Sequence, residues 1–184
     1  MGRSPRRQEG KLIMKDMNRL RKGGHVRRYH TVETIGQQTV ADHSWGVAMM
    51  VLQLQPDASA NLLKAALFHD LAEYDTGDTP AHAKWRSKPL KTALDDLERT
   101  VEDDLGIGVD LTSDELITLK VADMLELLWF CVEQARMGNR NVDEIWERGN
   151  AFLKENSARF HLDRSAAFNY AYLELTSVAK DIFP

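Results

Sequence analysis

The chain has 184 residues, of which 43% are hydrophobic and 28% are charged, a balance typical of a soluble globular protein with a buried core. Its length favours one domain. The formal net charge of −4 argues against a surface devoted to nucleic acid, although a local basic pocket or a metal can still bind a small anion. The single cysteine, Cys131, excludes an internal disulfide and is expected to be a small core residue.

The first ten residues carry three arginines among glycine, serine and proline. We expect residues 1–10 to form a disordered basic tail that is solvated rather than bound to nucleic acid. No apolar stretch approaches the roughly 20 residues of a membrane span, and no apolar signal-peptide segment follows the basic N-terminus. We therefore expect a cytoplasmic protein, from a bacterium or a phage-infected cell, with one domain over residues 11–184.

The remaining pattern of apolar residues is helical almost throughout. Glycines, prolines and a long loop over 25–38 separate the predicted helices. No strand-like alternation bounded by hairpin turns is found. The sequence therefore predicts an all-α bundle of about seven helices. They are expected over 11–22, 39–54, 59–74, 89–105, 113–137, 142–156 and 164–182, with one short helical turn over 81–85.

Acidic groups gather near the end of the very apolar segment 59–74. His69 and Asp70 are expected late in this helix, where an unpaired carboxylate costs several kcal/mol to bury. A divalent cation would offset that cost. Glu73 follows His69 by four residues and is expected on the same helical face, and Asp78 lies just past the helix end.

His43 on the preceding helix and Asp123 in the long helix extend this theme. Taken alone, His43 is better explained as an ordinary core or surface histidine, and Asp123 can be explained as a helix-surface carboxylate. Together with His69 and Asp70 they form a mixed imidazole and carboxylate set from three helices, which suits Zn, Mn, Fe, Co or Ni. Water bound to such a metal becomes a usable nucleophile near neutral pH.

The order His…His-Asp…Asp resembles that of the HD-domain phosphohydrolases, over roughly residues 11–135. The stretch 73–80 is similar to the Glu-x-x-x-Gly-Asp-x-Pro motif of bacterial 5′-deoxynucleotidases, and the Arg28-Tyr29 pair also matches. The segments 27–31 and 38–48 look closest to a phage branch, the dATP triphosphohydrolases of viruses that replace adenine by 2-aminoadenine. These features identify the chain as a member of the HD-domain family.

The resemblance implies a role for each matching residue. His43, His69, Asp70 and Asp123 would bind a divalent transition metal, with a second or third metal accompanying a polyphosphate. Glu73 would act as general acid/base or orient water, or else support His69. By the same resemblance, Asp78 and Arg28 would be catalytic as well as substrate-binding: Asp78 lies near the 5′ oxygen and sugar, and Arg28 contacts the phosphate and the scissile oxygen, where it would stabilise charge in the transition state. Tyr29 would contact the sugar.

Three candidate residues, Asp78, Arg28 and Lys84, also have a simpler interpretation. Asp78 is also explained as a turn residue before Pro80, and Arg28 as a solvated loop charge. Lys84 follows the acidic turn and is placed to meet β- or γ-phosphates, but it is equally well explained as a surface lysine.

The implied reaction cleaves the ester between the 5′ oxygen and the α-phosphorus of a deoxynucleotide, and dATP is the favoured substrate. The alternatives are a broad 5′-deoxynucleotidase for monophosphates and a non-catalytic nucleotide- or metal-binding module. A cyclic-dinucleotide phosphodiesterase is disfavoured, because its usual Gly-Tyr-Pro-type motif is missing. We expect a homo-oligomer, dimer or hexamer, with no membrane partner and no stable nucleic-acid complex.

Overall fold

The computed structural model describes residues 16–162 and 165–183, apart from the side chain of Trp85. The basic tail predicted for residues 1–10 lies outside these ranges, as does the start of the first predicted helix. The described residues contain no strand, only an isolated bridge between Arg27 and Thr39. The all-α prediction is confirmed. The helices are α1 (Met17–Gly23), α2 (Val40–Leu54), α3 (Ala60–Phe68), α4 (Glu73–Thr76), α5 (Ala81–Arg86), α6 (Lys88–Leu105), α7 (Ser113–Arg136), α8 (Asp143–Asn156) and α9 (Ala166–Ala179).

The helix starts follow from local capping chemistry. Thr39 begins α2 with a reciprocal capping box, in which its hydroxyl accepts from the Asp42 N–H and the Asp42 carboxylate accepts from the Thr39 N–H. Thr112 and Glu115 do the same at α7. These caps satisfy backbone donors that the first helical turn leaves without partners.

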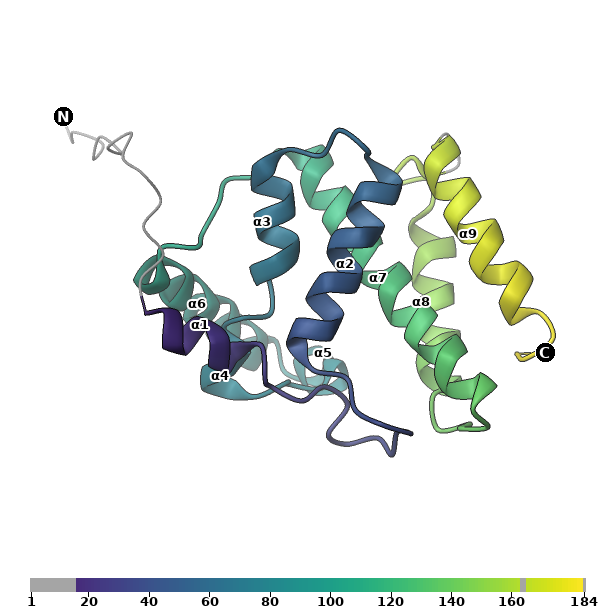
Figure 1. Cartoon of the computed structure of the whole chain (residues 1–184), viewed down its shortest axis with the longest axis horizontal. Helices are drawn as coiled ribbons and strands as arrows, with labels where there is room; N and C mark the ends of the chain where they lie inside the picture. Colours follow the sequence, from purple (N-terminus) through teal and green to yellow (C-terminus); the bar gives the residue numbers. More distant parts are fainter. Residues whose placement is uncertain (1–15, 163–164, 184) are drawn as a thin grey trace.

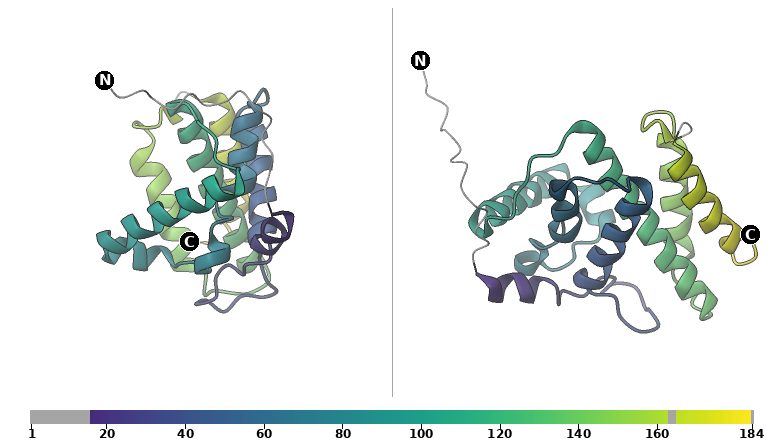
Figure 2. Two further views of the ribbon diagram at one scale, coloured as in Figure 1. Left: turned by 90° about the vertical axis from the view of Figure 1, so that its left-hand side faces the viewer. Right: turned by 45° about the horizontal axis from the view of Figure 1, so that its top comes forward.

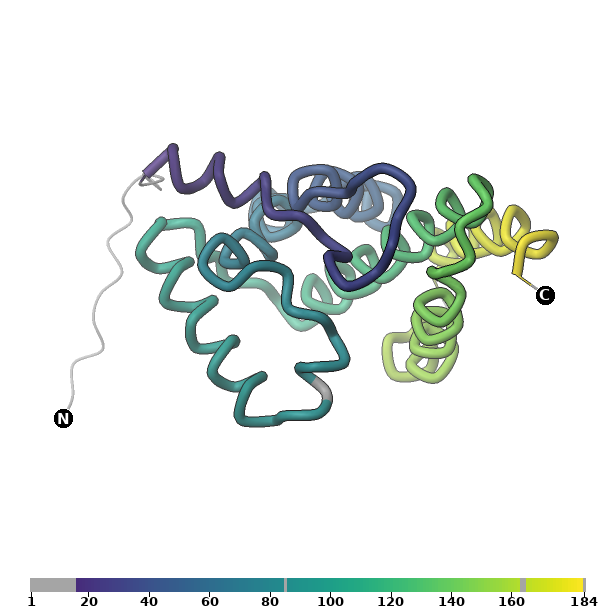
Figure 3. Tube along the Cα trace, turned by 90° about the horizontal axis from the view of Figure 1, so that it is seen from below, coloured from purple at the N-terminus to yellow at the C-terminus, as the bar shows by residue number. Residues whose placement is uncertain are grey.

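The central packing is formed by α2, which lies against α3, α7 and α9 (Figure 1). The long α7 also packs against α8 and α9, which lie at the C-terminal end of the molecule (Figure 2). From below, α6 lies toward one end of the molecule and α8 and α9 toward the other, with α2 and α7 between them (Figure 3). The arrangement brings α2, the end of α3 and the middle of α7 together.

The helix predicted over 59–74 is interrupted, so that prediction was wrong in one respect. α3 ends at Phe68, and i to i−3 hydrogen bonds carry the chain through Leu71 and Glu73 into the short α4. The physical reason is burial on two sides: Leu62 and Ala66 pack with α2 and α7, whereas Leu71 and Ala72 pack with Leu20, Val101, Leu105 and Ile107. One straight helix face cannot serve both clusters.

The loop predicted over 25–38 is confirmed as non-helical, and hydrogen bonds hold it at its base and at its tip. At its base, the Arg28 N–H donates to the Gln38 carbonyl oxygen at 3.0 Å. At its tip, the buried Gln134 side chain accepts from the Ile35 N–H at 2.8 Å and donates to the Ile35 carbonyl at 2.9 Å. The Asn139 amide adds a bond to the Glu33 carbonyl at 2.9 Å. The side chains at the end of α7 thus replace the hydrogen bonds that a strand partner would supply.

No helix among the described residues is long and apolar enough to cross a membrane.

Replacing Gln134 by leucine is expected to lower the free energy of unfolding by about 1–3 kcal/mol, because part-buried backbone groups of Ile35 lose their partner. Urea denaturation followed by circular dichroism measures the change. Arg136→Met, an exposed position on the same helix, serves as the control and is expected to stay within about 0.5 kcal/mol of the parent. Equal stability of the Gln134→Leu protein and the parent would contradict this account of the loop.

Candidate metal centre and active site

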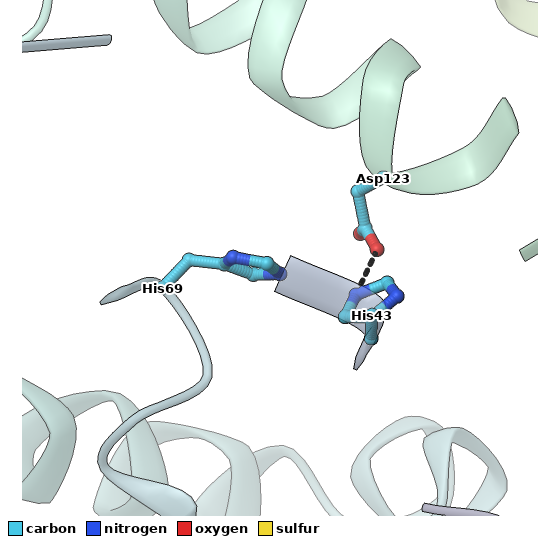
Figure 4. Close-up of side chains that lie close together, drawn as sticks. All are labelled: His43, His69 and Asp123. Carbon is cyan, nitrogen blue, oxygen red and sulfur yellow. Dashed lines mark ion pairs between the residues drawn. The ribbon is translucent and has the colours of Figure 1, made fainter. Parts of the chain in front are cut away.

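Three of the four predicted metal ligands converge from separate elements. His43 comes from α2 and is fully buried, His69 caps the end of α3, and Asp123 lies on α7. One ligand atom from each lies within 4.8 Å of the others, and His43 Nε2 is 3.2 Å from Asp123 Oδ1 (Figure 4). This is the spacing of donor atoms around a shared ion.

The fourth predicted ligand joins the same cluster. Asp70 Oδ2 lies 3.5 Å from the Nε2 atoms of both His43 and His69. The same oxygen accepts a hydrogen bond from Arg28 Nη1 at 2.5 Å. The structure therefore brings the four predicted ligands and Arg28 to one point.

The hydrogen bonds of the two histidines leave the correct nitrogen for a cation. His43 Nδ1 contacts the Glu126 carboxylate, and His69 Nδ1 lies 3.0 Å from the Ala66 carbonyl oxygen. Both contacts favour a proton on Nδ1, because carboxylate and carbonyl oxygens only accept. The Nε2 atoms of both rings are buried without a well-aligned hydrogen-bond partner. Two such nitrogens facing two carboxylates fit a divalent metal.

The charges around His43 shift pKa values in opposite directions. Burial lowers the pKa of His43, but the carboxylates of Asp123 and Glu126 outweigh it and raise that pKa to about 9. Burial raises the pKa of Asp70, but the positive charges of His69, Arg28 and His43 hold it below its usual value. Without a metal, a proton on His43 therefore balances the acidic cluster, and a bound cation would replace it.

Glu73 lies beside the cluster, and its pKa is shifted in the direction opposite to that of Asp70. Its side chain is buried, and its Oε2 has no hydrogen-bond partner. Burial, and then the negative charges of Asp70 and Asp78, raise the pKa of Glu73 to about 8. Its carboxyl group therefore carries a proton at neutral pH and is a candidate general acid. Because the helix is interrupted after Phe68, the predicted helical-face relationship between His69 and Glu73 does not exist.

Asp78 holds the turn that carries the predicted substrate residues. Its Oδ2 accepts a hydrogen bond from the Tyr29 N–H at 2.8 Å, and Tyr29 has a left-handed φ of 58°. The Tyr29 ring stacks on Phe130 with centroids 4.5 Å apart. A non-glycine residue in this conformation needs support from its surroundings, which the Asp78 bond and the stacking provide.

Lys84 on α5 lies at the edge of the same group. Its positive charge lowers the pKa values of Glu73 and Glu98, partly opposing the effect of burial on both, so it is near enough to act on them. Its side chain is half-buried. Among the described residues, no hydrogen bond or ion pair fixes the position of its ammonium group.

Comparison with known proteins gives the family. The family model described as HD domain matches residues 18–115. A dATP triphosphohydrolase from Salmonella phage PMBT28 is 31% identical over 154 residues, which cover 75% of this chain and 78% of the relative. The chain belongs to the HD-domain family of phosphohydrolases.

Solved structures agree with this HD-domain fold. The cyanophage S-2L HD phosphohydrolase DatZ, bound to dA and one catalytic Zn²⁺ ion, superposes with a TM-score of 0.66 at 18% identity, covering 92% of this chain and 99% of its own. An HD-domain phosphohydrolase from Listeria innocua gives a TM-score of 0.66 at 21% identity, covering 89% of this chain and 87% of its own. Asp123 lies beyond the matched domain segment, so its place in the site rests on its distance to His43.

Two buried residues of this HD-domain site, Glu126 and Gln38, were not predicted as site residues from the sequence. Glu126 contacts His43 Nδ1 and accepts a hydrogen bond from Gln38 Nε2 at 2.7 Å. The available signal was an acidic residue three positions after Asp123 inside an otherwise apolar helix segment. Such a residue requires a partner, as Asp70 does.

Removal of metal by a chelator is expected to lower the melting temperature, and Zn²⁺ or Co²⁺ to restore it. A cation at 100 times its dissociation constant adds about 2.7 kcal/mol to the folded state. Thermal denaturation with and without metal measures the effect. Asp123→Asn is expected to lose most of the response, whereas Asp114→Asn, exposed in the first turn of α7, should keep it. A melting temperature indifferent to chelator and metal would contradict the metal site.

Proposed function

We propose that this chain is a metal-dependent dATP triphosphohydrolase, which converts dATP and water to deoxyadenosine and triphosphate. The observation that carries the proposal is the pair of buried Nε2 atoms facing Asp70 and Asp123, beside the buried carboxyl group of Glu73, whose pKa is raised to about 8 by burial and by neighbouring carboxylates. The phage relative named dATP triphosphohydrolase supports the choice of nucleotide.

The proposed site holds His43, His69, Asp70 and Asp123 as metal ligands. The bound metal, for which Zn, Co, Mn, Fe and Ni are candidates, would polarise the α-phosphate and lower the pKa of a coordinated water. A second or third ion would accompany the polyphosphate. All four side chains approach from rigid or hydrogen-bonded segments, which favours precise placement of the reacting phosphorus.

The remaining side chains would handle charge and protons at the scissile bond. Water would add to the α-phosphorus and lose a proton to the solvent, the bond to the 5′ oxygen would break, and that oxygen would take the Glu73 proton. Arg28 has a buried Nε without a hydrogen-bond partner, and this donor is available to the phosphate. Asp78 would hold Arg28 and Tyr29 in place through the Tyr29 N–H, with the tyrosine beside the sugar.

Lys84 is proposed to meet the β- and γ-phosphates, because its charge already acts on Glu73. The expected homo-oligomer, a dimer or a hexamer, stays a prediction, as does the cytoplasmic location.

A product assay tests the proposed reaction. Incubation of dATP with Co²⁺ or Zn²⁺ in ¹⁸O-labelled water is expected to give deoxyadenosine and triphosphate, with the label in the triphosphate because water attacks phosphorus. Anion exchange and mass spectrometry resolve the products. Asp70→Asn should be inactive, and Asp57→Asn, exposed in the turn after α2, should match the parent.

The same assay separates the alternative functions. Phosphate release confined to dAMP-like monophosphates would replace the proposal with a broad 5′-deoxynucleotidase. Metal binding without hydrolysis of any deoxynucleotide would favour the non-catalytic module.

The rate is expected to fall at alkaline pH, because Glu73 must be protonated to act as the acid. The pKa of Glu73 is raised to about 8 by burial and by Asp70 and Asp78, so the proton is present below this value and lost above it. A bound divalent cation lowers this pKa, which places the falling limb at or below about pH 8. Glu73→Gln should lower kcat by about 10²–10⁴-fold and remove this limb. A pH–kcat profile of Glu73→Gln that keeps the limb would assign it to another group.

A further inference from the structure

We propose that Glu126 is a positioning residue, which fixes the metal ligand His43 and ties it to the loop that carries Arg28. The inference rests on the metal site proposed above and is independent of the nucleotide. Glu126 lies on α7, one turn after Asp123, and only 7% of it is exposed. Neither carboxylate oxygen is left without a partner, since one contacts His43 Nδ1 and the other Gln38 Nε2.

The contact with His43 selects which nitrogen faces the metal. A carboxylate can only accept, so it holds an imidazole proton on Nδ1 and leaves Nε2, which faces Asp70 and Asp123, as the nitrogen for a metal. An ionised partner also makes the imidazole a stronger ligand. His69 differs, because its Nδ1 faces the uncharged Ala66 carbonyl. Of the two histidines, only His43 relies on Glu126 to hold its Nδ1 proton.

The second carboxylate oxygen connects the metal ligand to the loop. Gln38 Nε2 donates to Glu126 Oε1 at 2.7 Å, and the Gln38 carbonyl accepts from the Arg28 N–H at 3.0 Å. Arg28 in turn donates to Asp70 Oδ2 at 2.5 Å. The chain of contacts from His43 through Glu126, Gln38 and Arg28 returns to Asp70, so it joins two metal ligands through the loop.

Gly46 makes the space that Glu126 occupies. A Cβ at position 46 would lie 2.7 Å from Glu126 Cγ and 3.2 Å from its Oε1. Glycine inside a helix costs about 0.5–1 kcal/mol relative to alanine, and here it allows α2 to approach the carboxylate. Gly46→Ala thus offers a way to displace Glu126 without changing its charge.

Metal affinity of the Glu126→Gln protein tests the inference. Co²⁺ binding is measured by competition with a chromogenic chelator and by the visible absorption of bound Co²⁺. Loss of the charge is expected to raise the dissociation constant about 10- to 100-fold and to change the absorption spectrum. Gly46→Ala should weaken binding in the same direction. Glu133→Gln is the matched control, because it makes the same substitution at an exposed position on the same helix.

The outcomes separate positioning from a merely structural role. A folded Glu126→Gln protein with the parent's Co²⁺ affinity and spectrum would overturn the inference, even if its melting temperature fell. If Glu126→Gln does not fold, Glu126→Asp keeps the charge but shortens its reach: weaker binding supports the inference, and unchanged binding overturns it. Failure of the parent itself to bind Co²⁺ would instead refute the metal site proposed above.

Discussion

The enclosure of several carboxylates around one histidine is the constraint on which this site depends. Asp70, Asp123 and Glu126 all approach His43, and like charges so close in a poorly solvated place destabilise one another. The shifts in pKa show how the folded chain compensates: His43 gains a proton and Glu73 keeps one. A cation at the two Nε2 atoms would supply positive charge in place of the proton on His43.

This arrangement depends on the end of α3 at Phe68. In a continuous α-helix, the positions of His69, Asp70 and Glu73 around the helix axis would be set by the helical repeat. The turn after Phe68 instead lets Leu71 and Ala72 pack away from α2, toward α1 and α6. His69 and Asp70 then face His43, while Glu73 remains buried beside them at the start of the short α4.

Local rules predicted much of the fold from the sequence, because capping and helical periodicity act within a few residues. Thr39 with Asp42, and Thr112 with Glu115, mark helix starts that the structure confirms. The convergence of His43, His69 and Asp123 was predicted from residue type, apolar context and family resemblance. The break after Phe68 was not predicted, because it results from burial against α1 and α6, which are distant in the sequence.

Glu126 shows most clearly why part of the site could not be predicted from the sequence. An acidic residue among leucines is conspicuous, but its partners Gln38 and His43 lie 88 and 83 positions away. Glu126 needs a partner for the same reason as Asp70, because an unpaired carboxylate is costly to bury. The sequence does not indicate that its partner is His43. This partner gives Glu126 its importance, because an imidazole proton fixed on Nδ1 leaves Nε2 to bind a metal. The same carboxylate holds Gln38, whose backbone holds Arg28, so the geometry of the cation site and of the phosphate-facing loop is determined together.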